Sequence, residues 1–432
     1  MADAAVPQSR VKVAGRPSQK NYRRQTCRLC DSRDLELVLE LTPTPLADAY
    51  VPPERAGEVQ ETYPLDLFLC RRCGLSQLLD VIHPEEIYLD YIYETASSLG
   101  LAEHFQRYAD EAVRRINPSK GSLAVDLGSN DGILLKAFKH HGLRVLGVEP
   151  AKRIAQQATA AGLETVPSFF TAQLGRQIRA ERGPASIITT NNLFANIDEL
   201  ADFTSGVRDL LAPDGVYIFE SFYLADWMEH LVFDFTYHEH LSYFSVKPLE
   251  AFFRHLGMEL IDVQRIPTKG GSLRYTAQRA DGPRPVAPAV AELLALEERL
   301  GLHRPEAFRA YAAQIDRAKQ ELWKLLGKLT GQGKTIIGYG ASATTTTLVY
   351  HFNLGSVLSV MVDDNPSKVG LRSPGLHIPV LPSQAIEDRK PDYVLILAWR
   401  YVEPIIKKHE AFLRQGGRFI VPLPELRVIE PA

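Results

Sequence analysis

Three features that assign a chain to a membrane, to secretion or to a polyanionic partner are missing from this sequence. No apolar run approaches the ~20 residues that a membrane-spanning helix needs. The first 20 residues are polar and contain no apolar signal core, so residues 1–20 are expected to be a disordered leader. The net charge of only -3 gives no electrostatic reason to bind nucleic acid or an anionic membrane. We therefore expect a cytoplasmic protein without either partner.

Cysteine is also scarce, and the four that occur form two pairs with C-x-x-C spacing, Cys27 with Cys30 and Cys70 with Cys73. Two such pairs match a tetrahedral zinc site made of four thiolates, whose closed coordination is structural. The rival interpretations are two redox dithiols or two disulfides. A reducing cytosol disfavours disulfides, and no βαβ unit surrounds either pair as in thioredoxin-like motifs. Arginines inside the pairs, Arg28 among them, are expected to offset the thiolate charge.

Hydrophobic residues make up 45% and charged residues 23% of the chain, which is ordinary for globular domains. A length of 432 residues allows two or three such domains. No pattern shows an exposed apolar face that demands an oligomeric partner, so the oligomeric state stays open. We place a zinc-binding module at 21–85, an α/β domain with a helical lead-in at 86–286, a helical connector at 287–330 and a smaller α/β domain at 331–432.

The most informative stretch runs from Leu123 to Gly132, where an apolar strand ends in an acid and a glycine turn, and a helical pattern follows. A second apolar strand, 144–148, then ends in Glu149. This is a βαβ unit in which the glycines let a ligand approach the backbone and the glutamate can hold two ribose hydroxyls. It predicts a site for an adenosyl cofactor, against the alternative of a strand–turn–helix without a ligand.

The acids in this turn decide between cofactors. A dinucleotide site uses G-x-G-x-x-G and places a pyrophosphate at a helix N-terminus. Here the pattern is Asp126-x-Gly128-x-x-x-Gly132 with a further acid at Asp131, and these carboxylates would repel a pyrophosphate. They suit a cofactor that carries an ammonium and a sulfonium. The pattern resembles that of class I S-adenosylmethionine (SAM) methyltransferases.

The second α/β unit carries a weaker signal. Gly338-x-Gly340 with an acid, Asp363, about 23 residues further on is a partial dinucleotide fingerprint. The third glycine is replaced by a threonine run, 344–347. Ser342 and these threonines can open a helix and donate to an anion, which favours phosphate or nucleotide binding. The alternative is a purely structural domain.

Between the two α/β units lies Tyr237-His238-Glu239-His240, which is dense in titratable groups. The spacing is not H-E-x-x-H, and histidines two residues apart do not share a helix face, so a zinc protease is excluded. One interpretation is a hydrogen-bonded surface turn. The other is an acid/base cluster in which an imidazole takes a proton while Glu or Tyr orients it. The segment follows the strand pattern 215–220, which places it near the ligand-binding edge of the first sheet.

Beyond residue 22 the chain resembles the bacterial sugar C-methyltransferase family, which methylates a carbon of nucleotide-linked keto-deoxysugars. Agreement over so many ordered motifs is not expected by chance. The motifs are the two C-x-x-C pairs, Tyr63-Pro64-Leu65, Asp126-x-Gly128-Ser129-Asn130-Asp131-Gly132, Asn191-Asn192, Tyr237-His238-Glu239-His240-Leu241-Ser242-Tyr243-Phe244, Gly270-Gly271-Ser272-Leu273-Arg274, Gly340-Ala341-Ser342, Val362-Asp363-Asp364-Asn365-Pro366, Lys368-x-Gly370, Pro374-Gly375-x-His377 and Ala398-Trp399.

The resemblance implies an α/β enzyme of three parts: a small N-terminal zinc module, a class I SAM methyltransferase Rossmann-like domain, and a smaller C-terminal Rossmann-like domain. The last of these would carry most of the nucleotide of a nucleotide-diphosphate sugar substrate. His240 matches the general base, with Tyr237 and Glu239 beside it, and would form an enolate that attacks the SAM methyl group. The residues implied to hold SAM are Asp126, Gly128, Ser129, Asn130, Gly132, Glu149, Pro150, Asn191 and Asn192. Those implied to hold substrate are Tyr93, Asn196, Lys269, Ser272, Gly340, Ser342, Asp363, Lys368, His377 and Arg400.

The chain departs from the family pattern at four places. Where the family usually has a His, this chain has Asn196, and where the family has the His of His-Gly-Gly-Ser, this chain has Lys269. A Lys-Gly-Asn of the family is replaced by three threonines at 344–346, and the Asn that usually follows Ala-Trp is replaced by Arg400. Lys269 and Arg400 are expected to hold phosphate or carboxylate in new places. Three alternatives stay open: an O- or N-methyltransferase acting on a sugar-related metabolite, a noncatalytic nucleotide-sugar binding protein, and a nicotinamide-dependent enzyme.

Overall fold

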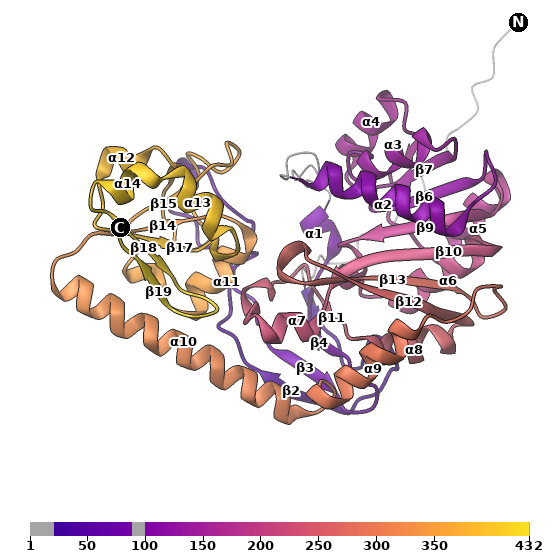
Figure 1. Ribbon diagram of the computed structural model, residues 1–432, viewed down its shortest axis with the longest axis horizontal. Coiled ribbons are helices and arrows are strands. Elements are labelled where there is room, and N and C mark those ends of the chain that lie inside the picture. The colour runs from indigo at the N-terminus through magenta and orange to yellow at the C-terminus, as the bar shows by residue number, and fades with distance from the viewer. Residues whose placement is uncertain (1–20, 89–99, 432) are drawn as a thin grey trace, which may run out of the picture.

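The largest layer is a seven-stranded sheet in which five neighbouring strands run parallel and two antiparallel strands close one edge (Figure 1). The structure, a computed structural model, describes residues 21–88 and 100–431. The parallel strands are mostly buried apolar runs, as expected for a sheet with helices on both faces. In spatial order the strands are β12 (Met258–Ile266), β13 (Ser272–Arg279), β10 (Leu211–Phe222), β9 (Ala185–Asn191), β6 (Leu123–Leu127), β7 (Arg144–Val148) and β8 (Thr165–Val166).

Helices cover both faces of this sheet. Because side chains alternate along a strand, Ala124 packs with the helices on one face and Val125 with those on the other. The first face is covered by α2 (Leu101–Ile116) and α3 (Ile133–His140), and the second by α5 (Ala172–Arg182), α6 (Leu200–Leu210) and α8 (Val246–His255). The remaining helices of this part are α4 (Lys152–Ala160), α7 (Leu224–Glu229) and α9 (Pro288–Leu300), the last of which contacts β12 and α8.

Two expected elements have different bounds in the structure. The helical lead-in expected from residue 86 to about residue 115 contains the end of α1 (Pro84–Tyr88) and nearly all of α2. Residues 89–99 between these helices are outside the described part. The alternating pattern from Tyr63 to Cys70 predicts a strand, but the strand in the structure begins only with β3 (Leu67–Cys70). Pro64 has no N–H to donate to a ladder, and Tyr63 pairs with Thr44 in an isolated bridge instead.

The N-terminal module contains a four-stranded antiparallel sheet that is completed from elsewhere in the chain. Its own strands are β2 (Leu35–Leu39), β3 and β4 (Ser76–Leu78), and a separate pair is formed by β1 (Asn21–Arg23) and β5 (Asp80–Ile82). The fourth strand is β11 (Ser242–Tyr243), in which Ser242 pairs with Gln77 and Tyr243 with Ser76. The residues directly after Tyr237-His238-Glu239-His240 therefore belong to the sheet of the zinc module.

The four cysteines come together at the tip of this module. Their sulfur atoms all lie within 4.8 Å of one another, as four ligands of one ion must. Cys27 and Cys73 are 3.6 Å apart, and so are Cys30 and Cys70, distances far too long for disulfides. Two chain segments 39 residues apart thus form one zinc site.

The C-terminal domain is a second Rossmann-like α/β unit. Strand β14 is flanked by β15 on one side and β17 on the other, so the connections change direction at β14. In spatial order the strands are β16 (Val380–Pro382), β15 (Met361–Asp363), β14 (Ile336–Tyr339), β17 (Tyr393–Ile396), β18 (Arg418–Val421) and the antiparallel β19 (Arg427–Ile429). The helices are α11 (Ala343–His351), α12 (Ala385–Arg389), α13 (Val402–Lys408) and α14 (Glu410–Arg414).

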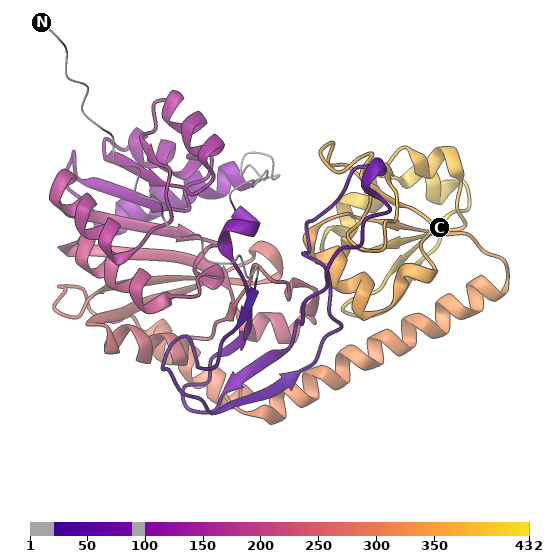
Figure 2. The ribbon, with the colours of Figure 1, turned by 180° about the vertical axis from the view of Figure 1, so that it is seen from behind.

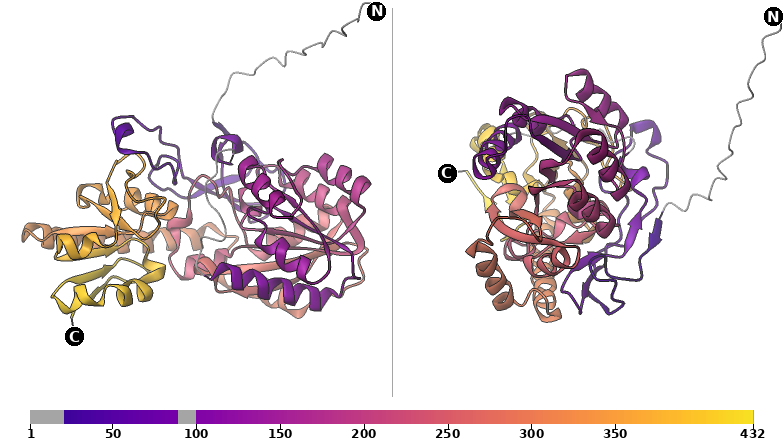
Figure 3. Two further views of the ribbon diagram at one scale, coloured as in Figure 1. Left: turned by 90° about the horizontal axis from the view of Figure 1, so that it is seen from above. Right: turned by 90° about the vertical axis from the view of Figure 1, so that its right-hand side faces the viewer.

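Two long segments join the methyltransferase and C-terminal domains, which lie at opposite ends of the molecule (Figures 1 and 3). Helix α10 (Pro305–Gly331) runs between them along one side and contacts β2. An extended part of the zinc module, residues 41–62 and here called the arm, crosses to the C-terminal domain (Figure 2). There Lys368 pairs with Asp48 at 2.7 Å, and Thr346 donates to the carbonyl of Ala47 at 2.7 Å.

In residues 21–88 and 100–431, no helix combines the length and the apolar character that a bilayer crossing requires. Helix α10 is the longest of those described at 27 residues. It carries charged side chains throughout, as a helix between two domains in water does.

We predict that Cys70→Ser abolishes zinc binding and destabilises the whole protein. Because the metal joins two distant segments of the module, we expect its loss to lower the melting temperature by about 10 °C. Metal analysis and thermal unfolding check this, with Arg72→Ser as the matched control, an exposed residue of the same C-x-x-C pair. Unchanged zinc content in Cys70→Ser would show that the four thiols do not form the metal site.

Candidate active site

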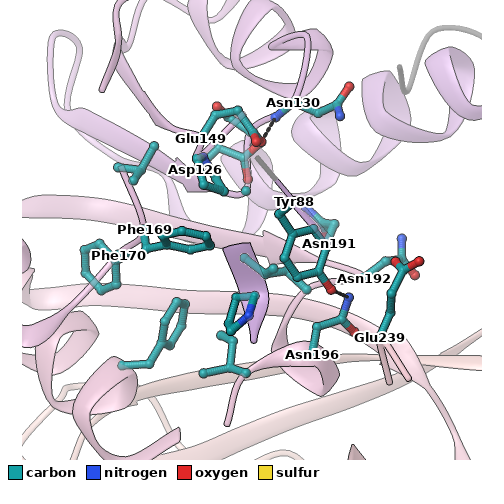
Figure 4. A pocket seen from close by; sticks show the side chains of 18 of the residues that line it. Tyr88, Asp126, Asn130, Glu149, Phe169, Phe170, Asn191, Asn192, Asn196 and Glu239 are labelled. Carbon is teal, nitrogen blue, oxygen red and sulfur yellow. Dashed lines mark hydrogen bonds between the residues drawn. The ribbon is translucent and has the colours of Figure 1, made fainter. Parts of the chain in front are cut away.

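A cavity of about 460 Å³ lies at the carboxyl ends of β6, β7 and β9, the edge at which open α/β sheets bind ligands (Figure 4). The cavity is lined both by the predicted cofactor-binding turn, residues 126–130, and by the segment 237–240. Of the residues predicted to bind or react, those that line it are Asp126, Gly128, Ser129, Asn130, Glu149, Pro150, Asn191, Asn192, Asn196, Tyr237, Glu239 and His240. Gly132 is not among the lining residues; it precedes α3 with φ +78° and ends the turn.

Asp126 is a buried carboxyl in the floor of this cavity. It lies near the end of β6, is 4% exposed and accepts a hydrogen bond of 2.6 Å from the hydroxyl of Thr189 on β9. Burial raises the pKa of Asp126 to about 7, and repulsion by Glu149 and Asp131 adds to the rise that the Thr189 bond opposes. A cationic ligand next to Asp126 would restore its carboxylate form.

Glu149 directly follows β7 and faces the cavity beside Asp126 (Figure 4). Its oxygens accept backbone N–H groups, from Asn130 at 3.0 Å and from Ala151 at 2.9 Å. Burial raises the pKa of Glu149, while these two bonds lower it. The carboxylate therefore fixes the turn and still has acceptor capacity for the ribose hydroxyls predicted for it.

The turn between Asp126 and α3 requires glycine at Gly128. Its φ of +74° lies in the left-handed region, and a Cβ there would meet Leu193 at 2.7 Å. The absent side chain leaves the backbone exposed to a ligand, as the motif predicts.

The cavity also contains polar atoms that have no partner within the described part of the chain. Two of them are Oδ1 of Asn191 and the hydroxyl of Ser129, both buried. Two carboxyls and an unpaired amide oxygen suit a ligand that carries positive charge and hydrogen-bond donors. These acceptor oxygens fit SAM, which Asp126, Glu149 and Asn191 would hold.

An aromatic wall of the cavity was missed in the sequence. Phe169 and Phe170 follow β8, and Phe203 of α6 stacks edge-on against Phe170 with ring centres 5.1 Å apart. These rings give the cavity an apolar side that suits an adenine base. No periodic signal marks the place, because β8 contains only two residues.

The opposite wall is built by the segment around His240. The His240 side chain is 7% exposed, and its ring centre is 4.2 Å from that of Tyr237. Its Nδ1 lies 2.9 Å from the carbonyl oxygen of Phe235. Because a carbonyl only accepts, Nδ1 carries the proton of the neutral ring and Nε2 keeps the lone pair.

The two histidines of this segment face different surroundings. Nε2 of His238 donates to the carbonyl of Tyr63 in the zinc module at 3.2 Å, and the side chain is 2% exposed. Burial lowers the pKa of His238 to about 4, so this ring is neutral at physiological pH. His238 holds the segment on the zinc module, and His240 is the histidine that reaches the cavity.

Asn196 lies beside a tyrosine that the sequence did not single out. Its amide nitrogen donates to the hydroxyl of Tyr88 at 2.9 Å, and both side chains line the cavity (Figure 4). Tyr93, which was predicted to contact substrate, lies outside the described residues.

Other predicted substrate residues lie in the C-terminal domain, at the ends of β14 and β15. Gly340 has φ +115°, and Ser342 begins α11 in a capping box with Thr345. Asp363 accepts the backbone N–H of Ala341 at 2.6 Å. They form the turn at which the sheet connections reverse and do not line the cavity.

The remaining predicted substrate residues are engaged with protein groups. Lys368 pairs with Asp48 of the arm, and His377 Nε2 lies 3.2 Å from the carbonyl of Glu58. Arg400 pairs with Asp234 rather than lying free for a phosphate. Ser272 is buried and donates to the carbonyl of Thr268, and Lys269 lies in η5 (Thr268–Gly270) with a side chain outside the described part.

Arg28 also differs from expectation. Its side chain turns away from the cysteines, and Nε donates to Asp198 in the cavity wall at 2.7 Å. Nη1 donates to the carbonyls of Leu78 and, at 3.3 Å, Leu241. Asp198 is a nearly buried carboxylate that needs a cation, and Arg28 and Arg24 both pair with it.

Three family profiles match the chain in order. They are a zinc binding domain over residues 27–88, a methyltransferase domain over 101–263 and a C-methyltransferase C-terminal domain over 267–424. Together with the seven-stranded sheet and the acid-lined cavity, they define a class I SAM-dependent methyltransferase with a cysteine zinc site.

The chain is 36% identical over 404 residues to the C-methyltransferase NovU of Streptomyces niveus. The match covers 93% of this chain and 96% of that protein. The chain belongs to the C-methyltransferase family. The fold class, the SAM cofactor and the structural zinc predicted from the sequence are confirmed.

Two solved structures each match less than half of the chain. The PH0226 protein of Pyrococcus horikoshii is 13% identical with a TM-score of 0.36, over 45% of this chain and 98% of that one. The CcbJ methyltransferase of Streptomyces caelestis is 15% identical with a TM-score of 0.33, over 44% and 94%. Likenesses this low add nothing to the fold described above.

We predict that SAM binds more tightly as the pH rises from 6.0 to 7.5. Asp126 with a pKa of about 7 is mostly protonated at the lower pH and mostly ionised at the higher one. Since only the carboxylate attracts a cation, the affinity should rise about eightfold. Isothermal titration calorimetry measures it, and Asp126→Asn should bind SAM weakly with little dependence on pH. A wild-type affinity that is constant over this range would contradict the prediction.

Proposed function

We propose that the protein transfers the methyl group of SAM to the carbon next to the ketone of a nucleotide-diphosphate-linked ketosugar, with His240 as general base. The observation that carries the proposal is a shared cavity: His240, Glu239 and Tyr237 line the one that contains Asp126 and Glu149. A base and a methyl donor held in one cavity can act on the same substrate carbon, which removes the entropic cost of bringing them together.

The chemistry follows from the acidity of a carbon next to a ketone. Nε2 of His240 takes the α-proton, and the electrons of the broken C–H bond form the enolate. SAM, when bound, supplies an electrophilic methyl group. The enolate carbon bonds to that methyl carbon while the electrons of the broken S–CH₃ bond stay on sulfur. Burial raises the pKa of Tyr237 well above its usual range, so Tyr237 remains a phenol that can donate to the enolate oxygen.

The C-terminal domain is the proposed holder of the nucleotide. In open α/β sheets, ligands bind at the point where the strand connections reverse, which here is the crevice after β14 and β17. The hydroxyls of Ser342 and Thr344 lie 2.9 Å apart at the start of α11, where a phosphate would meet donors. The loop after β17 also contacts the segment that carries the proposed base, because Arg400 pairs with Asp234.

We predict that His240→Gln lowers proton exchange at the α-carbon by about a thousandfold, because glutamine has no basic nitrogen. Exchange of deuterium from solvent into a panel of nucleotide-linked 4-ketosugars is followed by NMR, and methyl transfer from labelled SAM by mass spectrometry. SAM affinity should change by less than about twofold, since His240 is not among its proposed holders.

His141→Gln is the matched control, a surface histidine that pairs with Asp110 and should leave both rates unchanged. Exchange that survives in His240→Gln would exclude this residue as base. Label found on oxygen or nitrogen of the acceptor would replace C-methylation by O- or N-methylation.

A further inference from the structure

An arginine of the C-terminal domain reaches the segment that carries the proposed base. Arg400 lies in η7 (Trp399–Tyr401), and its Nη1 is 2.9 Å from each carboxylate oxygen of Asp234. Its guanidinium lies 4.4 Å from the ring centre of Phe235, and Nη2 donates to the hydroxyl of Thr344 at 3.1 Å. Arg400 is thus held by an ion pair, a ring and a hydroxyl at once.

Asp234 depends on this arginine. Its side chain is 0% exposed, and besides Arg400 it accepts a hydrogen bond of 3.0 Å from the indole N–H of Trp399. Burial raises the pKa of Asp234, and Arg400 and Trp399 oppose that rise. Without Arg400 the carboxyl must stay charged in a buried place or take up a proton, and either change disturbs the turn that contains it.

That turn is also the support of His240. Asp234 and Phe235 belong to the short helix η4 (Phe233–Phe235), and the carbonyl of Phe235 is the acceptor for Nδ1–H of His240. The Phe235 ring lies nearly parallel to the imidazole, with centres 6.1 Å apart. The residue that Arg400 covers is therefore the one that orients the base.

The geometry points to Arg400 as a positioning residue for His240. By fixing Asp234 and Phe235, it keeps the Phe235 carbonyl on Nδ1 and so leaves Nε2 as the basic nitrogen. The inference rests on the proposed function for the role of His240 in catalysis, but the tautomer itself does not depend on any substrate. The position of the base then also depends on the C-terminal domain, because Arg400 belongs to that domain and contacts Asp234 in the segment that carries His240.

The same contacts argue against a phosphate on Arg400, which the sequence had favoured. A guanidinium whose Nη1 binds a carboxylate and whose Nη2 binds Thr344 presents few donors to a ligand. A phosphate would have to displace Asp234 and leave it buried without its cation. We infer that Arg400 acts on the base indirectly, through its contact with Asp234.

The test is Arg400→Met, which keeps the length and apolar stem of the side chain and removes its charge and donors. Arg418→Met is the matched control, because Arg418 also lies over a ring, that of Tyr393 at 5.6 Å, and pairs with Glu430 at 3.2 Å. Asp234→Asn is the second variant, which keeps the shape of the turn and removes only its charge. Retained SAM binding shows that each variant is folded.

The first readout is nitrogen NMR of protein labelled in histidine, with His240 assigned by its missing signal in His240→Gln. We expect the Nδ1–H form in the wild type and in Arg418→Met, and a clear shift toward the Nε2–H form in Arg400→Met and Asp234→Asn. An unchanged His240 tautomer in both variants would overturn the inference.

The second readout separates positioning from substrate binding. A misplaced base should lower kcat by about a hundredfold, with little change in KM for the ketosugar. A raised KM with unchanged kcat would overturn the inference and make Arg400 a substrate ligand. If the wild type turns over no ketosugar but the tautomer still shifts in Arg400→Met, the positioning role stands and the proposed substrate fails.

Discussion

The buried polar segment 233–243 is the constraint on which the rest of the structure depends, because its polar groups must find partners away from water. The methyltransferase domain supplies only some of them, such as the carbonyl of Ala195 for the N–H of Leu241. The zinc module supplies the strand that pairs with β11, and the C-terminal domain supplies Arg400 for Asp234. Three parts of the chain are thus needed to place the segment that carries the proposed base.

The zinc site acts at a distance through the same segment. Four thiolates on one ion fix two chain segments relative to each other, and Arg28 sits inside the first of them. From there its side chain reaches Asp198 in the cavity wall and the carbonyl of Leu241 next to the proposed base. A metal with no open coordination position can therefore affect the cavity without contacting it, because it fixes the backbone from which Arg28 reaches the cavity wall.

The sequence predicted those parts of the site that are formed by residues close together in the chain. The strand ending in Asp126, the turn at Gly128 and Glu149 at the end of the second strand came from one continuous stretch, and the structure brings them into one cavity. Contacts between distant segments could not be predicted in this way. No motif indicates that Ser242 pairs with Gln77. Arg400 was expected to bind a ligand for the same reason, since only the folded chain reveals Asp234 as its partner.

Two histidines two residues apart show how the fold divides roles within one motif. His238 points to the zinc module, where burial lowers its pKa to about 4 and the carbonyl of Tyr63 accepts a hydrogen bond from its ring N–H. His240 lines the cavity, and the carbonyl of Phe235 selects its tautomer. A buried ring that is kept neutral fastens the segment to the zinc module, whereas a ring that lines a cavity can take a proton from a ligand. The difference comes from the groups that surround each ring, because the two side chains are chemically identical.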